Sequence, residues 1–450
     1  MSDWTVDQLR AKLATYPEIK GWSLHQENVH RRERYFLLDG GQLGLDQDRD
    51  VHQETLNLKI FVRRPQPGRQ GEIAKRIFRA LPLAEQLESA VAAARETDHQ
   101  SWELPAPVDS AGLPALRTAD PRMAEDLNGV MEEATARIAR AVRHSRVTRF
   151  DSAELFLSVH DRELTLSTGV RHRTSQTRIY LESAYSYAQA GKSDEYLSTR
   201  WAVSLDDLGV ENLFDETSER AHRSLDCDKP ASGKYAVIVD DEVLATLFNG
   251  HLTQLSAANG YHGLPFLKVG SEMIPGAQGD LVTLTLDPSL DFGANTAALS
   301  EQGVAQRPLR VVDKNRVVGT VADQQFASYL GIAPTTIRGN VVLEAGTRTL
   351  EELTREEPRV LEILQFSGLF SDANSGTFGS EIRLARLHET GKPVRYLKGG
   401  SLSGSVVENL RRARFSQETI CRAHFTSGAP HGQGYFGPRY ALLGEVSVAG

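Results

Sequence analysis

The stretch EIRLARLHETGKPVRYLKGG, residues 381–400, alternates apolar and polar side chains on both sides of Gly391. Alternation with a period of two is typical of a half-buried strand, and glycine favours the tight turn between two such strands. Four more short β-patterned pieces surround it, at residues 279–287, 308–321, 338–346 and 440–450. The sequence beyond residue 229 therefore predicts a large mixed sheet with few helices.

Three helices are expected to interrupt this β-rich half, at residues 322–330, 350–356 and 404–414. Thr349 and Glu352 have the spacing of a capping box, in which two side chains satisfy free backbone N–H groups at a helix start. Ser403 stands directly before the third helix, where serine is a favoured cap.

The first half mixes strands and helices. Strand patterns near residues 21–62 recur near residues 151–225, which suggests a strand–strand–strand–helix unit present twice; a chance recurrence is the alternative. Between them, residues 121–143 keep one apolar face at helical spacing behind Asp120, which predicts one long helix. The predicted fold is α+β: an N-terminal α/β domain over 1–228 and a β-rich C-terminal domain over 229–450.

Composition narrows the functional classes. The 450 residues carry a formal net charge of −8, so no positive field exists to hold nucleic acid or an acidic membrane surface. Residues 1–19 contain several charges in place of an apolar signal segment, and no apolar run is long enough to span a membrane. With only Cys227 and Cys421, a reducing compartment is indicated. We expect a soluble cytoplasmic protein without nucleic-acid or membrane partners.

Familiar enzyme signatures are missing from the sequence. No two histidines stand four residues apart beside a glutamate, as helix-borne zinc hydrolysis requires, and neither a nucleophile elbow nor a phosphate-binding loop occurs. Cys227 lies between two aspartates, which disfavours a thiolate. A zinc site assembled from distant segments stays open. Glycine- and serine-rich segments at 247–260, 367–381 and 398–405 suit either a peptide cleft or ordinary hairpin turns.

These segments resemble the TldD/PmbA (TldD/TldE) family, once called modulators of DNA gyrase, whose members form zinc-dependent peptidase assemblies. The resemblance runs through TLFNGHLTQLSA (246–257), residues 300–331, GLFSDANSGTFGSEI (368–382), GKPVRYLKGGSLSGSVVENL (391–410) and LLGEVSVAG (442–450). It implies that the motif positions line a peptide cleft: Asn249, Gly250, His251, Asp372, Ser375, Gly376, Phe378, Ser403 and Gly404.

In the catalytic TldD-type subunit the motif H-E-x-x-x-H supplies two zinc ligands and a base, and a cysteine near the C-terminus supplies a third ligand. The resemblance places Thr246 at the first histidine, Leu247 at the glutamate and His251 at the second histidine, while Cys421 comes too early to match the cysteine. This pattern is similar to the PmbA/TldE-type subunit. It implies a chain with no catalytic residues and no metal of its own, and zinc in a TldD-type partner.

The partner implied is thus a TldD-type catalytic subunit, with a homodimer as the alternative, and the substrate is an unfolded or small peptide. Two other functions stay open. One is a self-sufficient metallopeptidase with a rearranged zinc site drawn from His251, His262, His424 or His431. The other is a peptide-binding, chaperone-like module that holds a peptide for another enzyme.

Overall fold

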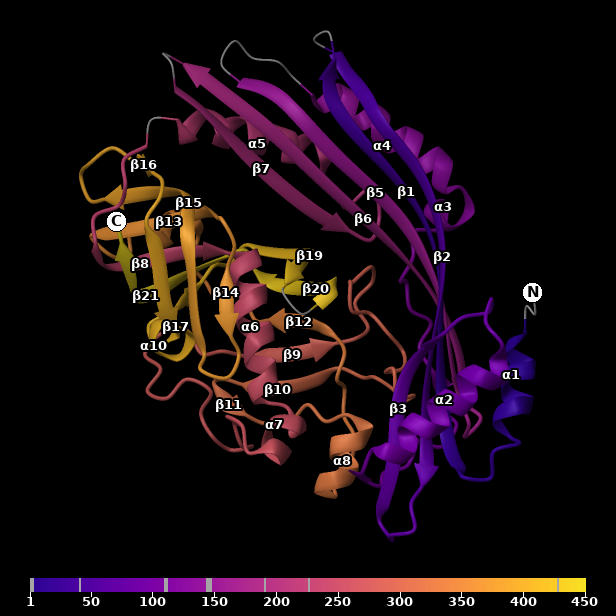
Figure 1. The fold of residues 1–450 in the computed structure, drawn as a ribbon. Coiled ribbons are helices and arrows are strands. Elements are labelled where there is room, and N and C mark those ends of the chain that lie inside the picture. Colours follow the sequence, from indigo (N-terminus) through magenta and orange to yellow (C-terminus); the bar gives the residue numbers. More distant parts are fainter. Residues whose placement is uncertain are drawn as a thin grey trace.

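The computed structural model describes residues 4–39, 42–108, 112–142, 148–189, 192–225, 227–426 and 429–450. Over these residues the fold is α+β, as the sequence predicts, and two large sheets dominate it (Figure 1). One sheet has 13 strands in the order β11-β10-β9-β12-β20-β19-β7-β6-β5-β1-β2-β3-β4. The other runs β13-β8-β21-β17-β15-β14, with β16 and β18 attached to β15 and β21.

The strands of the larger sheet have these bounds: β1 (Ile19–Asp39), β2 (Gln42–Arg63), β3 (Arg69–Ile77), β4 (His99–Gln100), β5 (Thr148–Leu166), β6 (Arg171–Gln189), β7 (Lys192–Ala202), β9 (Leu284–Asp287), β10 (Leu309–Asp313), β11 (Arg316–Val317), β12 (Asn340–Leu343), β19 (Thr419–Thr426) and β20 (Ala429–Pro438). Those of the smaller sheet are β8 (Gly233–Asp240), β13 (Arg359–Phe366), β14 (Phe370–Asp372), β15 (Thr377–Glu389), β16 (Arg395–Leu397), β17 (Ser401–Ser405), β18 (Arg414–Phe415) and β21 (Tyr440–Ala449).

The helices are α1 (Val6–Leu13), α2 (Leu83–Glu96), α3 (Pro121–Glu125), α4 (Leu127–Ala141), α5 (Val210–Ser224), α6 (Asp241–Gln254), α7 (Ala257–His262), α8 (Gln324–Leu330), α9 (Leu350–Leu353) and α10 (Val406–Leu410). Within the part of the chain that the structure describes, no helix combines the length and the apolar character needed to cross a bilayer.

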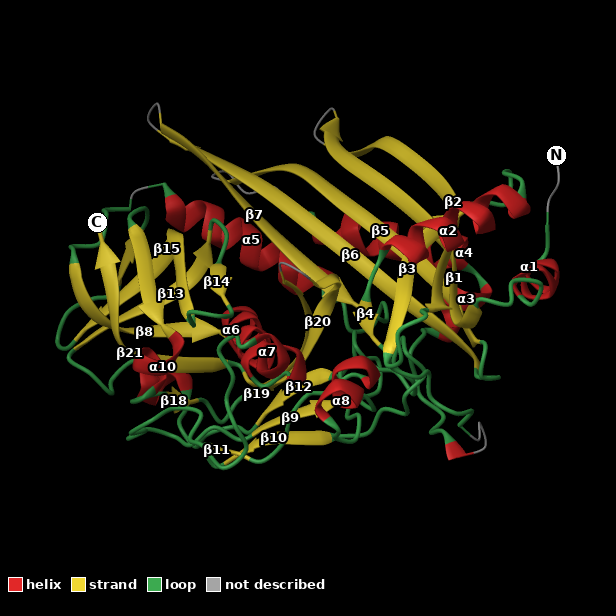
Figure 2. Cartoon of the chain, turned by 60° about the horizontal axis from the view of Figure 1, so that its bottom comes forward, coloured by secondary structure: helices red, strands yellow, loops and turns green. Residues whose placement is uncertain are grey.

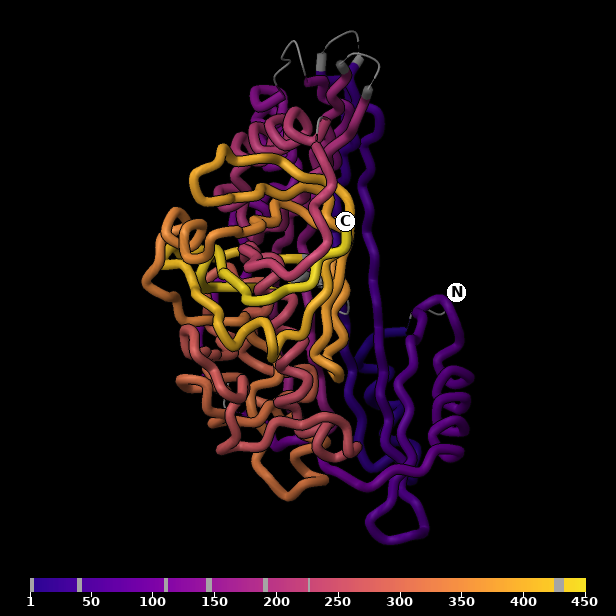
Figure 3. Tube along the Cα trace, turned by 90° about the vertical axis from the view of Figure 1, so that its left-hand side faces the viewer, coloured from indigo at the N-terminus to yellow at the C-terminus, as the bar shows by residue number. Residues whose placement is uncertain are grey.

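Long antiparallel hairpins build the N-terminal half. Strands β1 and β2 run from one end of the molecule to the other, with the C-terminal half to one side of them (Figure 3). The order strand–strand–strand–helix occurs twice, as β1-β2-β3-α2 and as β5-β6-β7-α5, and the two units meet through β1 and β5. Whether the two units are a duplication stays a prediction.

The long helix expected over residues 121–143 is instead two helices, α3 and α4, that run along the long strands with α5 (Figure 2). The break falls at Asp126, whose backbone leaves the helical region with φ −145° and ψ 78°. Its side chain accepts a hydrogen bond from the backbone N–H of Gly129 at 2.9 Å, so Asp126 caps α4. The predicted apolar face is confirmed from Leu127 to Ile138, where its residues are buried.

Short helices in the C-terminal half appear near their expected places. The capping box of Thr349 and Glu352 is present at the start of α9. The expectation that Ser403 caps the next helix is wrong, because Ser403 is in β17 and pairs with β15 and β21; Ser405 is the N-cap of α10. Because β17 must stay extended to pair with β15 and β21, α10 begins two residues later than expected.

The two halves of the chain share the larger sheet. Ala423 of β19 pairs with Trp201 of β7, and this contact joins C-terminal strands to N-terminal strands. The boundary expected at residue 229 stays a prediction, and the sheet continues across it. Helix α6 lies between the two sheets, in contact with β8 and β14 on one side and with β12, β19 and β20 on the other (Figure 1). Its buried apolar side chains belong to the main core of the C-terminal half.

Candidate functional site

Helix α6 begins where the buried strand β8 ends. Asp240 is the N-cap, and its carboxylate accepts a hydrogen bond from the backbone N–H of Val243 at 3.3 Å. Burial, with the neighbouring charges of Asp241 and Glu242, raises the pKa of Asp240 to about 7. This carboxyl group is therefore poised to gain or lose a proton near neutral pH.

The next carboxylate behaves differently. Asp241 is 3 % exposed, and its Oδ2 lies 2.8 Å from Nε2 of His424 and 3.9 Å from Nη1 of Arg422. Burial opposes its ionisation, but the contact with His424 and the charge of Arg422 outweigh burial and hold the pKa of Asp241 below its usual value. These groups line a polar cavity of about 140 Å³ to which β7 and α5 also contribute. Asp241 and His424 lie in two segments far apart in the sequence, so no local sequence signal predicts that they meet.

The three positions of the expected zinc motif follow along α6. The hydroxyl of Thr246 donates to the carbonyl of Glu242 at 3.0 Å, a bond within the helix. Leu247 is 1 % exposed and packs in the apolar core. His251 is equally buried, and burial lowers its pKa to about 4, so the imidazole is neutral at physiological pH. Its Nε2 has no hydrogen-bond partner among the described residues.

The glycine-rich loop between β14 and β15 packs on this part of α6. The side chain of Gln254 donates to the carbonyl of Ala373 at 2.6 Å, and a Cβ atom added to Gly250 would approach Ser371 Oγ at 3.4 Å. A Cβ on Gly376 would lie 3.8 Å from Cε1 of His251. The loop therefore covers the ring of His251.

Internal hydrogen bonds shape the loop. Asp372 accepts from the backbone N–H groups of Asn374 at 2.8 Å and Ser375 at 3.3 Å, and these bonds lower its pKa. Gly376 has φ +66°, which favours glycine at the turn. The Ser375 hydroxyl lies 2.7 Å from that of Thr377.

The third predicted segment pairs with this loop. Phe378 stands opposite Gly404, and Gly379 opposite Ser403, in the β15–β17 ladder. A Cβ on Gly404 would come within 2.5 Å of the Phe378 ring, so this glycine permits the ring to pack against the strand. The structure thus places the glycine-rich loop against His251 and Gln254 of α6, and β17 pairs with the strand that follows this loop. Asn249 lies beside Gly250 on α6, and whether these segments bind peptide stays a prediction.

Other candidate ligands lie apart from His251. His262, in α7, is exposed, and its ring makes edge-to-face contacts with Tyr261 and Phe326. The side chain of His431 falls outside the described residues. Among the described residues, His251, His262 and His424 belong to no group of three ligand-bearing side chains with atoms close enough to hold one ion. Burial, with the charge of Asp207, raises the pKa of the Cys421 thiol, which disfavours a thiolate ligand there.

The C-terminal half of the chain matches a known protein family. Residues 232–450 match the model of the PmbA/TldA metallopeptidase C-terminal domain. Residues 232–450 therefore form a C-terminal domain of the PmbA/TldD type. A curated relative, a protein named "Metalloprotease" from Methanothermobacter thermautotrophicus, is 24 % identical over 218 residues, 45 % of this chain and 47 % of that protein. The alignment thus spans about half the length of the relative.

Three solved structures share the fold over nearly the whole chain. A putative modulator of DNA gyrase from Bacteroides thetaiotaomicron superposes with a TM-score of 0.77 at 17 % identity, over 99 % of this chain and 98 % of that one. A putative modulator of a DNA gyrase from Thermotoga maritima gives 0.77 at 18 %, and TldE from Thermococcus kodakarensis 0.74 at 17 %, each over 99 % of both chains. At these identities the likeness shows a common fold.

Proposed function

We propose that this TldD/PmbA-family chain is a PmbA/TldE-like, non-catalytic subunit of a heteromeric zinc peptidase that acts on unfolded or small peptides in the cytoplasm. The observation that carries the proposal is the chemistry of α6. At the positions of the zinc motif stand a hydroxyl bonded to its own helix, a core leucine and a single imidazole.

These residues do not fit a catalytic zinc ion. Such an ion takes three protein ligands and keeps one position open for water, with a carboxylate nearby as base. Thr246 and Leu247 offer neither a nitrogen ligand nor a carboxylate, and His251 lies under the glycine-rich loop. No catalytic step is therefore assigned to this chain, and zinc is expected in a TldD-type partner.

The end strand of the smaller sheet supports the proposal of peptide binding. β14 is the last strand of the smaller sheet over the described residues, and it lies beside α6 (Figure 1). Phe370 on this strand is 77 % exposed, which is unusual for a phenylalanine. An extended peptide can add to such an edge through main-chain hydrogen bonds, with an exposed aromatic ring as an anchor for its side chains.

Reconstitution tests the proposal. Cleavage of an unstructured peptide should require this chain together with a TldD-type protein, and a chelator should abolish it. Cleavage by the isolated chain that is lost in His251→Ala would instead indicate a self-sufficient metallopeptidase. Stable peptide capture without cleavage in either case would indicate a chaperone-like module.

The role of the edge strand can be tested separately. Phe370→Ser should weaken peptide capture by the complex about tenfold, because an anchoring aromatic side chain contributes about 1–2 kcal/mol or more to binding. Fluorescence anisotropy of a labelled peptide measures this change. Phe78→Ser is the matched control, since Phe78 is also exposed, at 49 %, and lies outside β14. Equal loss in both variants would contradict a role for the edge.

A further inference from the structure

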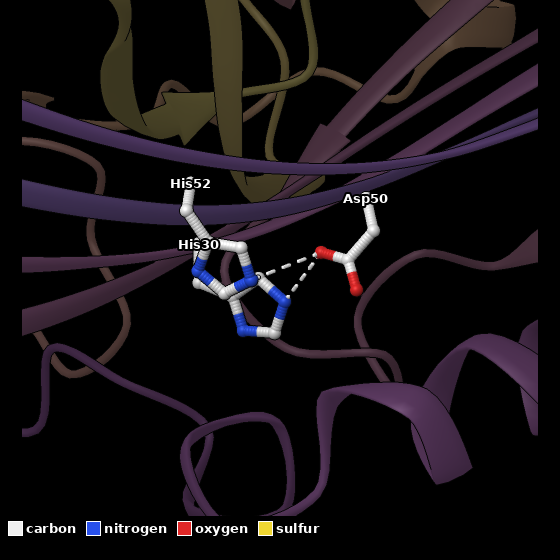
Figure 4. Close-up of side chains that lie close together, drawn as sticks. All are labelled: His30, Asp50 and His52. Atoms are coloured by element: carbon white, nitrogen blue, oxygen red, sulfur yellow. Dashed lines mark hydrogen bonds and ion pairs between the residues drawn. The ribbon is translucent and has the colours of Figure 1, made fainter.

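Three side chains on the long N-terminal hairpin converge on one point, far along the sequence from the family's motif. They are His30 of β1 and Asp50 and His52 of β2 (Figure 4). We infer that they form a binding site for a divalent transition-metal ion of the zinc, nickel or copper class. This inference is independent of the proposed function.

Strand register creates the cluster. His30 and His52 are direct partners in the antiparallel β1–β2 ladder. Asp50 is two residues from His52, and because side chains alternate along a strand, the two point to the same face of the sheet. All three therefore project from one face without any help from a loop, so the backbone that carries them is hydrogen-bonded.

The distances suit a shared ion. Asp50 Oδ1 lies 2.9 Å from His30 Nε2 and 3.3 Å from His52 Nε2. Zinc ligands at about 2.0–2.1 Å in tetrahedral geometry stand about 3.3 Å apart. The two rings are stacked, with centroids 4.1 Å apart and planes at 15°, and both Nε2 atoms point toward the carboxylate (Figure 4). Only small side-chain shifts would be needed to admit an ion.

The surroundings leave the site open to solvent and orient its carboxylate. The side chains of His30, Asp50 and His52 are 33, 47 and 71 % exposed, so water or a side chain of another molecule can complete the coordination. Arg32 Nη1 lies 3.9 Å from Asp50 Oδ2, but this guanidinium also bonds Asp48 and Asn128. Arg32 thus faces the far oxygen of Asp50 and leaves Oδ1 directed at the imidazoles.

The donor set determines the class of metal. Two imidazoles and one carboxylate favour Zn²⁺, Ni²⁺ and Cu²⁺, whereas Mg²⁺ and Ca²⁺ prefer oxygen ligands throughout.

The position of the site along β1 indicates what a bound ion would do to the structure. Leu24 and Phe36 on the same face of β1 pack in the clusters under α2 and under α4, respectively. His30 lies between these two covered ends, where an ion would tie β1 to β2.

The experiment is titration of the purified full-length chain with Zn²⁺ by isothermal calorimetry, with Co²⁺ absorption as a second readout. Wild-type protein should bind one ion at this site, and His52→Ala and Asp50→Asn should each weaken this binding at least tenfold. His99→Ala, a change at another exposed strand histidine, should leave it unchanged. Mg²⁺ should not compete.

The outcomes are distinguishable from those of the proposed function. Loss of the nitrogen-ligand spectrum of Co²⁺ in the folded double variant His30→Ala/His52→Ala, with circular dichroism unchanged, would support the site. Equal binding by wild type and double variant would overturn it, as would binding lost only in His251→Ala. Cleavage of peptide by a reconstituted complex tests the other proposal and should not depend on His30 or His52.

Discussion

Helix α6 and the β1–β2 hairpin both carry histidine, but in opposite settings. His251 on α6 is 1 % exposed, is covered by a glycine-rich loop and has a leucine and a threonine where further metal-binding groups would stand. His52 on β2 is exposed and shares a carboxylate oxygen with His30. On the helix, the expected motif retains one imidazole, at His251, whereas the hairpin brings two imidazoles and a carboxylate together. Convergence of donor atoms, and not place in a motif, decides where an ion can bind.

The largest expected effect comes from placing a glutamate at Leu247, the position of the glutamate in the expected zinc motif. Leu247→Glu should lower the free energy of unfolding by about 3–5 kcal/mol, because it buries a carboxylate in an apolar core without a partner. Urea denaturation monitored by circular dichroism measures the loss. Thr253→Glu, at an exposed position on the same helix, is the control and should change stability little. A stable Leu247→Glu protein would mean that the helix still tolerates catalytic chemistry.

A second test uses the pKa of the buried imidazole. His251 has a folded pKa of about 4 against an ordinary value of 6.5, so the unfolded chain binds the extra proton between these values. Stability from this group is full above pH 6.5 and is lost as the pH falls toward 4, by about 2–3 kcal/mol. His251→Phe should remove that part of the acid sensitivity. Denaturant midpoints measured from pH 4 to pH 8 give the slope.

The matched variant on the hairpin is His52→Phe, which changes an exposed ring. Its pH profile is the reference for that of His251→Phe, since no buried imidazole has been removed. If His251→Phe and His52→Phe had the same pH profile, the contrast in burial between the two regions would have no energetic consequence.

Local signals in the sequence predicted local structure well. The alternation around Gly391 predicted the β15–β16 hairpin, and the spacing of Thr349 and Glu352 predicted a capping box. Both features depend on residues that are close along the chain. The break at Asp126 was missed, since apolar spacing continues through it and only the side-chain cap reveals it. The spacing of apolar residues shows which face of a helix is buried, but it does not show where the backbone leaves the helical conformation.

Long-range pairing could not be predicted in the same way. His30 and His52 meet because of a register that runs along strands of 21 and 22 residues, and no pattern in the sequence fixes which residues stand opposite. The contact of Asp241 with His424 depends on β19 returning beside α6. The resemblance to the TldD/PmbA family, in contrast, singled out both α6 and the glycine-rich loop that packs on it, because it depends on the order of segments along the chain. That these segments line a peptide cleft stays a prediction.

The smallest expected effect concerns Asp240 at the start of α6, where burial disfavours the ionised form of a carboxyl group. The pKa of Asp240 is raised to about 7, so the unfolded chain holds fewer protons than the folded one between pH 3.8 and 7. Stability therefore falls as the pH rises through this range, opposite in sign to the effect of His251. Asp240→Asn keeps a capping side chain and removes the charge, and should stabilise the protein at pH 8 by about 1–2 kcal/mol but not at pH 4.

Asp241→Asn is the contrasting variant: it removes a carboxylate that contacts His424 and should destabilise the protein at pH 8. If both variants shifted the denaturation midpoint at pH 8 in the same direction, the two neighbouring carboxyl groups would not differ in the way their contacts require.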